Sequence, residues 1–297
     1  MHLRLTSICV LLAAHAWAAG ANVDRAQGLY MHTDYAGAIR LLSESSSDAA
    51  ELRLLGQCLF HAGDLKRATE VLEKAAAIAP GDSGIQLWLG RTYGRRAETS
   101  FALLAVGLAT HTREAFEQAV KLDPMNRDAV NDLFEFYLQA PALMGGGVEK
   151  ARGLMPVLDR ADPAEAWQAR ARLYEQAKQY ESAEAAIYHA IEMEPENTGQ
   201  IMNMARFLER RGRHMESDEW SDRAAKIAPA SPALMYSRAA IWVHAKRRLD
   251  EARNLLKKYI ALDSLTPDEP SRADAIKLFE RAGGQKADIA TGRRVSR

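Results

Sequence analysis

The chain has 297 residues with 39 acidic and 39 basic side chains, so no net charge draws it to nucleic acid or to an anionic membrane. Hydrophobic residues make up 47% of the sequence and aromatic residues only 7%. This composition favours helices packed on helices over a β-sandwich, in which aromatic and β-branched residues are enriched.

The N-terminal segment has the three parts of a secretory signal peptide. Arg4 ends a short positive segment, residues 7–14 (SICVLLAA) form an apolar run, and Ala16 and Ala18 are small residues placed for cleavage. The apolar run is too short to span a bilayer. We therefore expect a signal peptide at 1–18, cleaved after Ala18, and a periplasmic or secreted mature protein without a transmembrane segment.

Cleavage would leave Cys58 as the one cysteine of the mature chain, because Cys9 lies in the apolar run. One cysteine cannot form an internal disulfide, so packing alone has to hold the fold together. We expect Cys58 to be a small buried hydrophobe on a helix and not a reactive thiol.

Prolines follow helix-like segments at nearly regular intervals. KAAAIAP ends at Pro80, QAVKLDP at Pro124, HAIEMEP at Pro195 and RAAKIAP at Pro229, and LDRADP at Pro163 is a looser copy. The last two full copies are 34 residues apart, while intervals of 44 and 39 residues after the first two indicate insertions. Because proline cannot continue a helical hydrogen-bond ladder, each copy predicts the end of a helix.

Other residues recur at fixed places in this 34-residue period. Small residues at positions 8, 20 and 27 let the two helices of a unit approach closely, and large residues at 4, 7, 11 and 24 fill the space between them. With Pro80 as position 32, these are Leu55, Gly56, Leu59, Ala68, Leu72 and Ala75; in the unit ending at Pro195 they are Trp167, Tyr174, Ala183, Ile187 and Ala190.

This pattern resembles the tetratricopeptide repeat over nearly the whole mature chain. The resemblance implies an all-α solenoid, a right-handed superhelix of helix–turn–helix units, each with a helix A and a helix B. We expect about six to seven units over residues 19–283, with insertions near 97–110 and 141–147. Residues 268–282 are expected to form a C-terminal capping helix and residues 284–297 a disordered basic tail.

The first insertion contains an almost wholly apolar run, FALLAVGLA, at residues 101–109. In one arrangement it packs flat against neighbouring repeats and leaves an open groove. In the other, Phe101, Leu103, Leu104, Val106 and Leu108 close over an enclosed apolar cavity. The second arrangement belongs to an alternative function, a periplasmic small-molecule or lipid carrier similar in architecture to the tetratricopeptide component of certain solute transporters.

The second insertion, PALMGGG at residues 141–147, places three glycines before Lys150. A phosphate-binding loop needs GxxxxGK[ST] between a strand and a helix. Here a predicted helix at 133–140 precedes the glycines, and Val148 and Glu149 stand where the lysine and hydroxyl would be needed. We therefore expect a flexible connection to a helix B at 148–155, with an anion held at that helix's N-terminus as the alternative.

Catalytic and metal-binding motifs are not found in the sequence. The histidines are scattered, none belongs to an HExxH motif, and GxSxG and EF-hand loops are missing. We expect a protein that is not an enzyme and that has no cofactor and no metal site.

The resemblance also implies where a ligand binds, because helix A lines the concave groove of these proteins. Positions 5 and 9 give nine candidate groove residues: Arg53, Gln57, Arg91, Asn131, Glu135, Gln168, Arg172, Arg206 and Tyr236. Their four arginines either form a broken basic stripe that pairs carboxylates or are ordinary solvated side chains. The carboxylate-clamp pattern of the chaperone-binding members is not matched.

A second basic feature falls at the turns between helix A and helix B. Residues 95–96, 210–213 and 246–248 are rich in arginine and lysine and would line one edge of the solenoid. Such an edge is either solvated or contacts an anionic lipid or polymer.

These observations together favour a non-catalytic scaffold or adaptor of the bacterial cell envelope. We expect it to bind a segment of a protein partner in the concave groove. A small apolar or anionic ligand is the other partner class considered, and nucleic acid is not expected.

Overall fold

The computed structural model describes residues 21–290. The predicted signal peptide at 1–18 lies outside this range. Residues 21–290 contain helices and connections without a β-strand, so the predicted all-α solenoid fold is confirmed. Within the same range, no helix is both long enough and apolar enough to cross a membrane.

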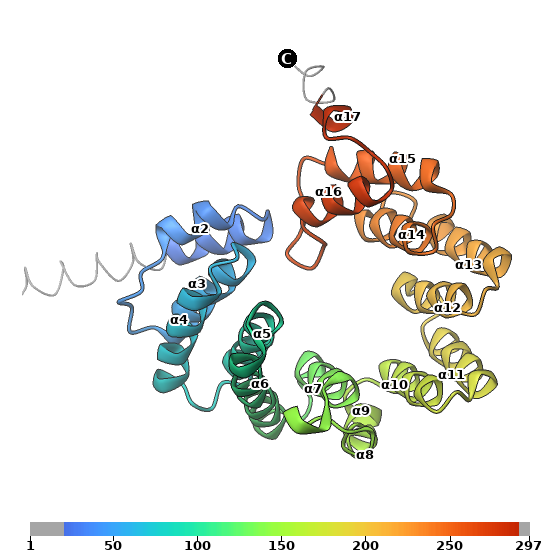
Figure 1. The fold of residues 1–297 in the computed structure, drawn as a ribbon. Helices are drawn as coiled ribbons and strands as arrows, with labels where there is room; N and C mark the ends of the chain where they lie inside the picture. Colours follow the sequence, from blue (N-terminus) through green and yellow to red (C-terminus); the bar gives the residue numbers. More distant parts are fainter. Residues whose placement is uncertain (1–20, 291–297) are drawn as a thin grey trace, which may run out of the picture. The chain divides into compact units, whose positions relative to one another are not determined.

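The chain divides into two compact units, unit 1 at residues 1–157 and unit 2 at residues 158–297 (Figure 1). Unit 1 contains a helix at residues 21–31 followed by α2 (Tyr35–Leu41), α3 (Ala49–His61), α4 (Leu65–Ile78), α5 (Ser83–Thr99), α6 (Ala102–Leu122), α7 (Arg127–Gln139), the 3₁₀ helix η1 (Ala142–Met144) and α8 (Val148–Gly153). Helix α9 (Met155–Ala161) contains the boundary. Unit 2 contains α10 (Pro163–Gln176), α11 (Tyr180–Met193), α12 (Thr198–Arg210), α13 (His214–Ile227), α14 (Pro232–His244), α15 (Leu249–Ile260), α16 (Arg272–Arg281) and α17 (Ala287–Ala290).

Successive helices pack as pairs, and the prolines end the second helix of a pair as predicted. Helices α4, α6, α11 and α13 each stop two residues before Pro80, Pro124, Pro195 and Pro229. In each case the next helix A then begins after a capping residue, Asp82, Asn126, Asn197 or Ser231, whose side chain accepts a hydrogen bond from a first-turn amide.

Pro163 follows the same rule, because α9 ends at Ala161, two residues before it, but the turn that follows is shorter than in the other copies. Pro163 stands at the first position of α10, directly after the capping residue Asp162. Proline suits this position because the first helical amide has no partner within the helix. Pro163 therefore follows the end of a helix B and also begins the next helix A, which is how this copy differs from the others.

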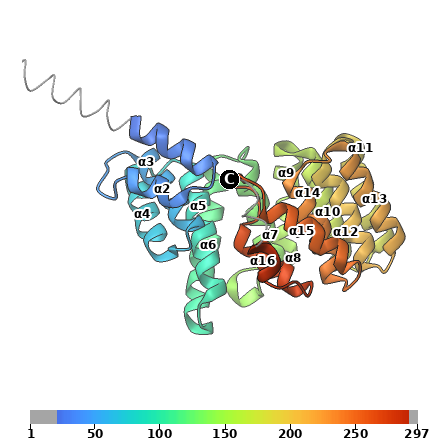
Figure 2. The same cartoon turned by 90° about the horizontal axis from the view of Figure 1, so that it is seen from above.

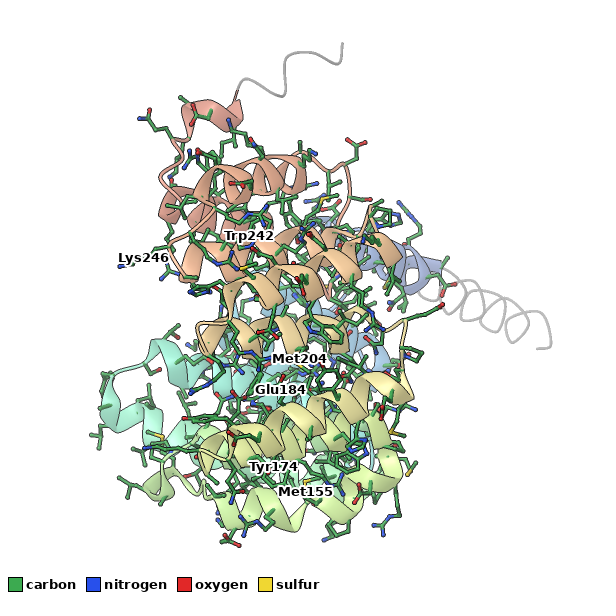
Figure 3. All side chains as sticks on the ribbon, turned by 90° about the vertical axis from the view of Figure 1, so that its right-hand side faces the viewer. Met155, Tyr174, Glu184, Met204, Trp242 and Lys246 are labelled. Carbon is green, nitrogen blue, oxygen red and sulfur yellow. The ribbon has the colours of Figure 1, made fainter. Side chains whose placement is uncertain are left out.

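Small residues do bring paired helices together. A Cβ atom on Gly56 of α3 would lie 2.5 Å from the Leu72 side chain of α4, and one on Gly90 would lie 2.4 Å from Phe116. Ala68 and Ala183 on helices α4 and α11 are fully buried. In unit 2 the core includes Met204 of α12 and Trp242 of α14, which Figure 3 labels.

Helix α16 is the predicted capping helix, and its Phe279 and Ala275 are fully buried against the core of unit 2. The predicted disordered tail begins at residue 284, but residues 287–290 form α17. The rest of that tail, residues 291–297, lies outside the described range.

The first insertion lengthens both helices of its pair. Helix α5 has 17 residues and α6 has 21, and their hairpin extends past the neighbouring helices of unit 1 (Figure 2). Phe101 is 71% exposed, Leu103 83% and Leu104 44%, whereas Leu108 is buried. The first residues of the apolar run therefore project into solvent, whereas Leu108 and Ala109 at its end pack against neighbouring helices, so the packed arrangement holds for the end of the run only.

The three glycines form a loop whose amides are already engaged. The amides of Gly145, Gly146 and Gly147 donate to the carbonyls of Ala142, Pro141 and Tyr137 at 2.9, 3.2 and 2.7 Å. A Cβ atom on Gly146 would lie 1.8 Å from the Ala140 carbonyl oxygen, so only glycine fits there. The three glycine amides are therefore not free to hold an anion; the alternative of an anion at the N-terminus of α8, which begins at Val148, stays a prediction.

Helix B of this pair is longer than predicted and is interrupted. Helix α8 begins at Val148 as expected, but the helical segment continues after Leu154 as α9 and ends at Ala161 instead of residue 155. Pro156 explains the interruption, because it lacks the amide that would donate to the carbonyl one turn earlier.

Candidate ligand-binding faces

Helix A of unit 1 carries arginines that are paired within the protein. Arg91 of α5 places Nε 2.6 Å from Asp132 and Nη2 3.0 Å from Asp128, both on α7. Arg53 of α3 lies 3.2 Å from Asp82, the capping residue of α5. Each arginine therefore joins its own helix A to the helix A of the following repeat.

Burial shifts the pKa values within this group. Burial raises the pKa of Asp132 and outweighs the opposing effect of the Arg91 guanidinium. Burial alone would lower the pKa of Arg91, but its hydrogen bond with Asp132 and the charges of both aspartates outweigh burial and raise it. Arg91 stays charged and is a structural cation of unit 1.

A hollow of about 580 Å³ lies beside this arginine in unit 1. Helices α5, α6 and α7 and the segment that follows α7 line it, and two of the predicted groove residues, Arg91 and Glu135, are among the lining residues. Phe116 and Phe136 supply apolar surface. The hollow is polar on the α7 side because Asp132 and Glu135 lie there.

Arg206 of α12 in unit 2 is in a different environment. It is half-buried and its guanidinium donates to the side-chain oxygen of Asn203, one turn earlier on the same helix. Burial, together with the positive charges of Arg210 and Arg172, lowers the pKa of Arg206. Among residues 21–290, no carboxylate forms an ion pair with this guanidinium.

Arg206 borders a second hollow, of about 550 Å³, within unit 2. Tyr236, Ala240 and Ile241 of α14 give it an apolar wall, and Ser237 and His244 of the same helix are polar members of the lining.

The one acidic side chain in that lining, Glu209, is already engaged. Its carboxylate accepts from Arg247 at 2.5 and 2.7 Å and lies 2.8 Å from His214. Burial alone would raise the pKa of Glu209, but the hydrogen bonds from Arg247 and Ser217 outweigh burial and lower it. Glu209 therefore does not serve as the counterion of Arg206.

The structure brings together two pairs of the predicted groove residues, Arg91 with Glu135 and Arg206 with Tyr236. The others line neither hollow: Arg53, Gln57, Asn131, Gln168 and Arg172.

Gln168 is only 5% exposed, and its side-chain nitrogen is buried without a hydrogen-bond acceptor. A buried donor in this state is unusual in a folded protein.

Sequence reasoning missed the carboxylates that decide the role of each arginine. Asp132 stands six residues after the capping residue Asn126, and Asp128 stands two residues after it. The position of each aspartate in the repeat can be read from the sequence. Its pairing with Arg91 cannot be read from a single repeat, because Arg91 and Asp132 are 41 positions apart in the chain. A comparison of helix A positions between successive repeats would have found it.

The basic edge is largely neutralised by carboxylates. Arg210 pairs with Glu175 at 2.8 Å, Arg213 with Glu184 at 2.5 Å, and Arg247 with Asp218 at 2.7 Å. Arg211 lies 3.5 Å from the centre of the Tyr180 ring. The arginines of this edge in unit 2 are therefore engaged within the protein, while Lys246 is exposed, and contact of the edge with an anionic lipid or polymer stays a prediction.

Cys58 is buried, as predicted, and burial raises the pKa of its thiol to about 12. A thiol with such a pKa is protonated at neutral pH and is a poor nucleophile. No group of His, Cys, Asp and Glu side chains within residues 21–290 is arranged to hold a metal ion.

Comparisons with known proteins agree with this architecture. Residues 29–87 and residues 164–197 each match a family model described as tetratricopeptide repeat. A search of curated proteins gives no match.

Two solved structures have a similar fold. A tetratricopeptide repeat protein from Parabacteroides merdae is 13% identical, with a TM-score of 0.60 over 90% of this chain and 100% of that one. A thermophilic tetratricopeptide repeat protein from Thermus thermophilus is 20% identical, with a TM-score of 0.52 over 64% of this chain and 99% of that one. The chain therefore contains tetratricopeptide repeat sequence at 29–87 and 164–197, and its fold is that of tetratricopeptide repeat solenoids.

Proposed function

We propose that this protein is a non-catalytic scaffold that binds an extended segment of a protein partner on the helix A face of its repeats. The observation that carries the proposal is the pair of hollows, about 580 and 550 Å³, lined largely by successive A helices. Each has room for several side chains of a ligand. Tetratricopeptide repeat proteins are generally scaffolds for protein interactions, which supports this assignment.

The side chains of the unit 2 hollow argue for binding over catalysis. Ser237 and His244 both line it and are the residue types of a nucleophile and its base. They are seven residues apart on α14, which separates them by about 10 Å along the helix axis. A serine and a histidine at that separation cannot share the hydrogen bond that activates the nucleophile.

Site-specific photo-crosslinking tests the proposed binding face. A benzophenone amino acid placed at Tyr236 or Phe136 reports on the two hollows, and the same amino acid at Tyr188, exposed on helix B, is the matched control. We expect covalent adducts with a partner polypeptide in cells from the first two positions only. Adducts from Tyr188 alone, or equally from all three positions, would contradict the proposal.

We also propose that the protein acts in the cell envelope, which rests on the signal peptide predicted at residues 1–18. Fractionation of the producing cells and the intact mass of the protein test this. We expect the periplasmic or secreted fraction to contain a chain that lacks those residues. A full-length chain confined to the cytoplasm would refute the envelope assignment.

A further inference from the structure

The unit 2 hollow contains a positive charge that the described part of the chain does not neutralise. The side-chain oxygen of Asn203 accepts from Arg206, and the other groups that act on its charge are the cations Arg172 and Arg210. A half-buried charge without a counterion lowers the stability of a fold unless a ligand supplies one. Arg206 therefore lowers the stability of the free protein.

In unit 1 the arginine at the equivalent place on helix A, Arg91, is neutralised by carboxylates. Arg91 and Arg206 both stand nine residues after the capping residue of their helix, Asp82 and Asn197. Asp132, the partner of Arg91, stands six residues after the next capping residue. The residue at that place in unit 2 is Ser237, which lines the hollow. Unit 2 thus has a short neutral side chain and open space where unit 1 has a carboxylate.

We infer that Arg206 binds a carboxylate from the partner, an Asp or Glu side chain within an extended peptide, while a neighbouring apolar side chain of the peptide packs on Tyr236, Ala240 and Ile241. This inference rests on the proposed function and specifies the chemistry of the bound segment. Arginine presents a planar pair of donors that fits a carboxylate. The apolar wall beside it takes an aliphatic or aromatic side chain.

The surroundings favour a singly charged carboxylate over a phosphate group. Glu209 borders the same hollow and keeps its negative charge through its pair with Arg247. A doubly charged phosphate would be repelled by Glu209 more strongly than a carboxylate would. The acidic group of the peptide is therefore an Asp or Glu side chain and not a phosphorylated residue.

Retention of synthetic peptides on the immobilised mature chain tests this inference. Two pools of peptides of about nine residues, acetylated and amidated at their ends, carry Leu-Glu-Leu or Leu-Gln-Leu at the centre with randomised flanks. We expect the protein to retain the Glu pool about tenfold more than the Gln pool, which corresponds to about 1.4 kcal/mol. Arg206→Gln should abolish this preference, and Arg223→Gln, which removes a cation on α13 away from the hollow, should keep it.

Ser237 provides a second, independent pair of variants. Ser237→Asp places a carboxylate where unit 1 has Asp132, so it should occupy Arg206 and abolish the preference for the Glu pool. Ser237→Asn adds a side chain of similar size without charge and should retain the preference. Folding of each variant is checked by circular dichroism before binding is compared.

The outcomes separate the carboxylate inference from the proposed function. Equal retention of the two pools, or a Glu preference that survives Arg206→Gln or Ser237→Asp, overturns the carboxylate inference but leaves peptide binding in place. A third pool, the Gln peptides made with a free C-terminus in place of the amide, is the control for a terminal carboxylate, and retention of this pool alone also overturns the inference. Retention of no peptide contradicts the proposed function of this face as well.

Discussion

Arg91 in unit 1 and Arg206 in unit 2 occupy equivalent places on helix A but have opposite surroundings. Arg91 lies within 3.0 Å of two aspartates on α7, whereas Arg206 borders an apolar hollow with Ser237 at the place of the aspartate. The repeat frame therefore decides where an arginine lies. The next repeat decides whether that arginine stabilises the fold or stays available to a ligand.

Arg247 in unit 2 is expected to give the largest effect, because it pairs with two carboxylates, Glu209 and Asp218, whose side chains are only 9% and 23% exposed. Arg247→Met should lower the free energy of unfolding by about 3 kcal/mol at neutral pH, since Glu209 loses its arginine and Asp218 keeps only Arg248, at 3.2 Å. Urea unfolding followed by circular dichroism measures this loss. Arg223→Met, an exposed control on α13, should change stability by less than about 0.5 kcal/mol.

The same pair of carboxylates predicts acid sensitivity. Burial opposes ionisation of Asp218, but hydrogen bonds from Arg247 and Trp242 outweigh burial and lower its pKa from 3.8, as Arg247 and Ser217 lower that of Glu209 from 4.5. A lowered folded-state pKa contributes stability above the unfolded-state pKa, and this contribution is lost as pH falls through the folded-state pKa. The difference in stability between the wild type and Arg247→Met should therefore shrink below about pH 4.5. A constant difference from pH 7 to pH 3 would contradict this cause.

Arg91→Met should lower the free energy of unfolding by about 2 kcal/mol, because Asp132 and Asp128 lose the guanidinium that neutralises them. The effect should be smaller than for Arg247 because Asp128 is largely exposed. Thermal unfolding compared with Arg95→Met, which breaks only the exposed pair with Glu98, isolates the buried contribution. Equal losses of stability in the two variants would show that the ion pairs between Arg91 and α7 contribute no more than an exposed ion pair does.

Arg206→Met should have the opposite sign and raise the free energy of unfolding by about 1 kcal/mol in the absence of ligand. It removes a half-buried charge that has no carboxylate partner among the described residues and keeps most of the side-chain volume. The opposite signs at Arg91 and Arg206 are the sharpest test of the comparison between the units. A loss of stability in Arg206→Met would mean that the guanidinium has a structural role.

The turns between helix A and helix B should give the smallest effect. Gly63 in unit 1 and Lys178 in unit 2 both have positive φ, at 83° and 58°, in the turn that follows their helix A. Lysine is strained in this left-handed region and glycine is not, so Lys178→Gly should raise stability by about 0.5 kcal/mol. Lys74→Gly, inside the exposed face of α4, should instead lower it by about 1 kcal/mol. Calorimetry of both variants measures the difference.

Prediction from the sequence succeeded where the signal is local. The prolines at 80, 124, 195 and 229 end helices because proline lacks an amide hydrogen, which is a property of one residue. The small residues Gly56 and Gly90 likewise identify where two helices of one pair approach closely. At Pro163 the helix end was also predicted correctly, but the place of the proline at the first position of the next helix was not, because proline suits both places.

The insertions were located by counting residues, but their structures were not predictable from composition. The apolar run at 101–109 was expected to pack or to cover a cavity; it lengthens a helical hairpin in which Leu108 and Ala109 are packed and Phe101 and Leu103 are exposed. A hydrophobic run is buried only if the fold places another surface opposite it. In unit 1, the two longer helices carry Phe101 and Leu103 beyond such a surface.

The sequence by itself determined the repeat period, the helix ends and the all-α fold, because these depend on residues that are close together in the chain. Only the tertiary structure decided which arginines are paired, since Arg53 and Asp82 are 29 positions apart and Arg91 and Asp132 are 41 apart. Electrostatic interaction depends on distance in space and on burial, neither of which appears in a single repeat. For that reason the basic stripe predicted from four similar arginines resolved into structural ion pairs in unit 1 and an unneutralised cation, Arg206, in unit 2.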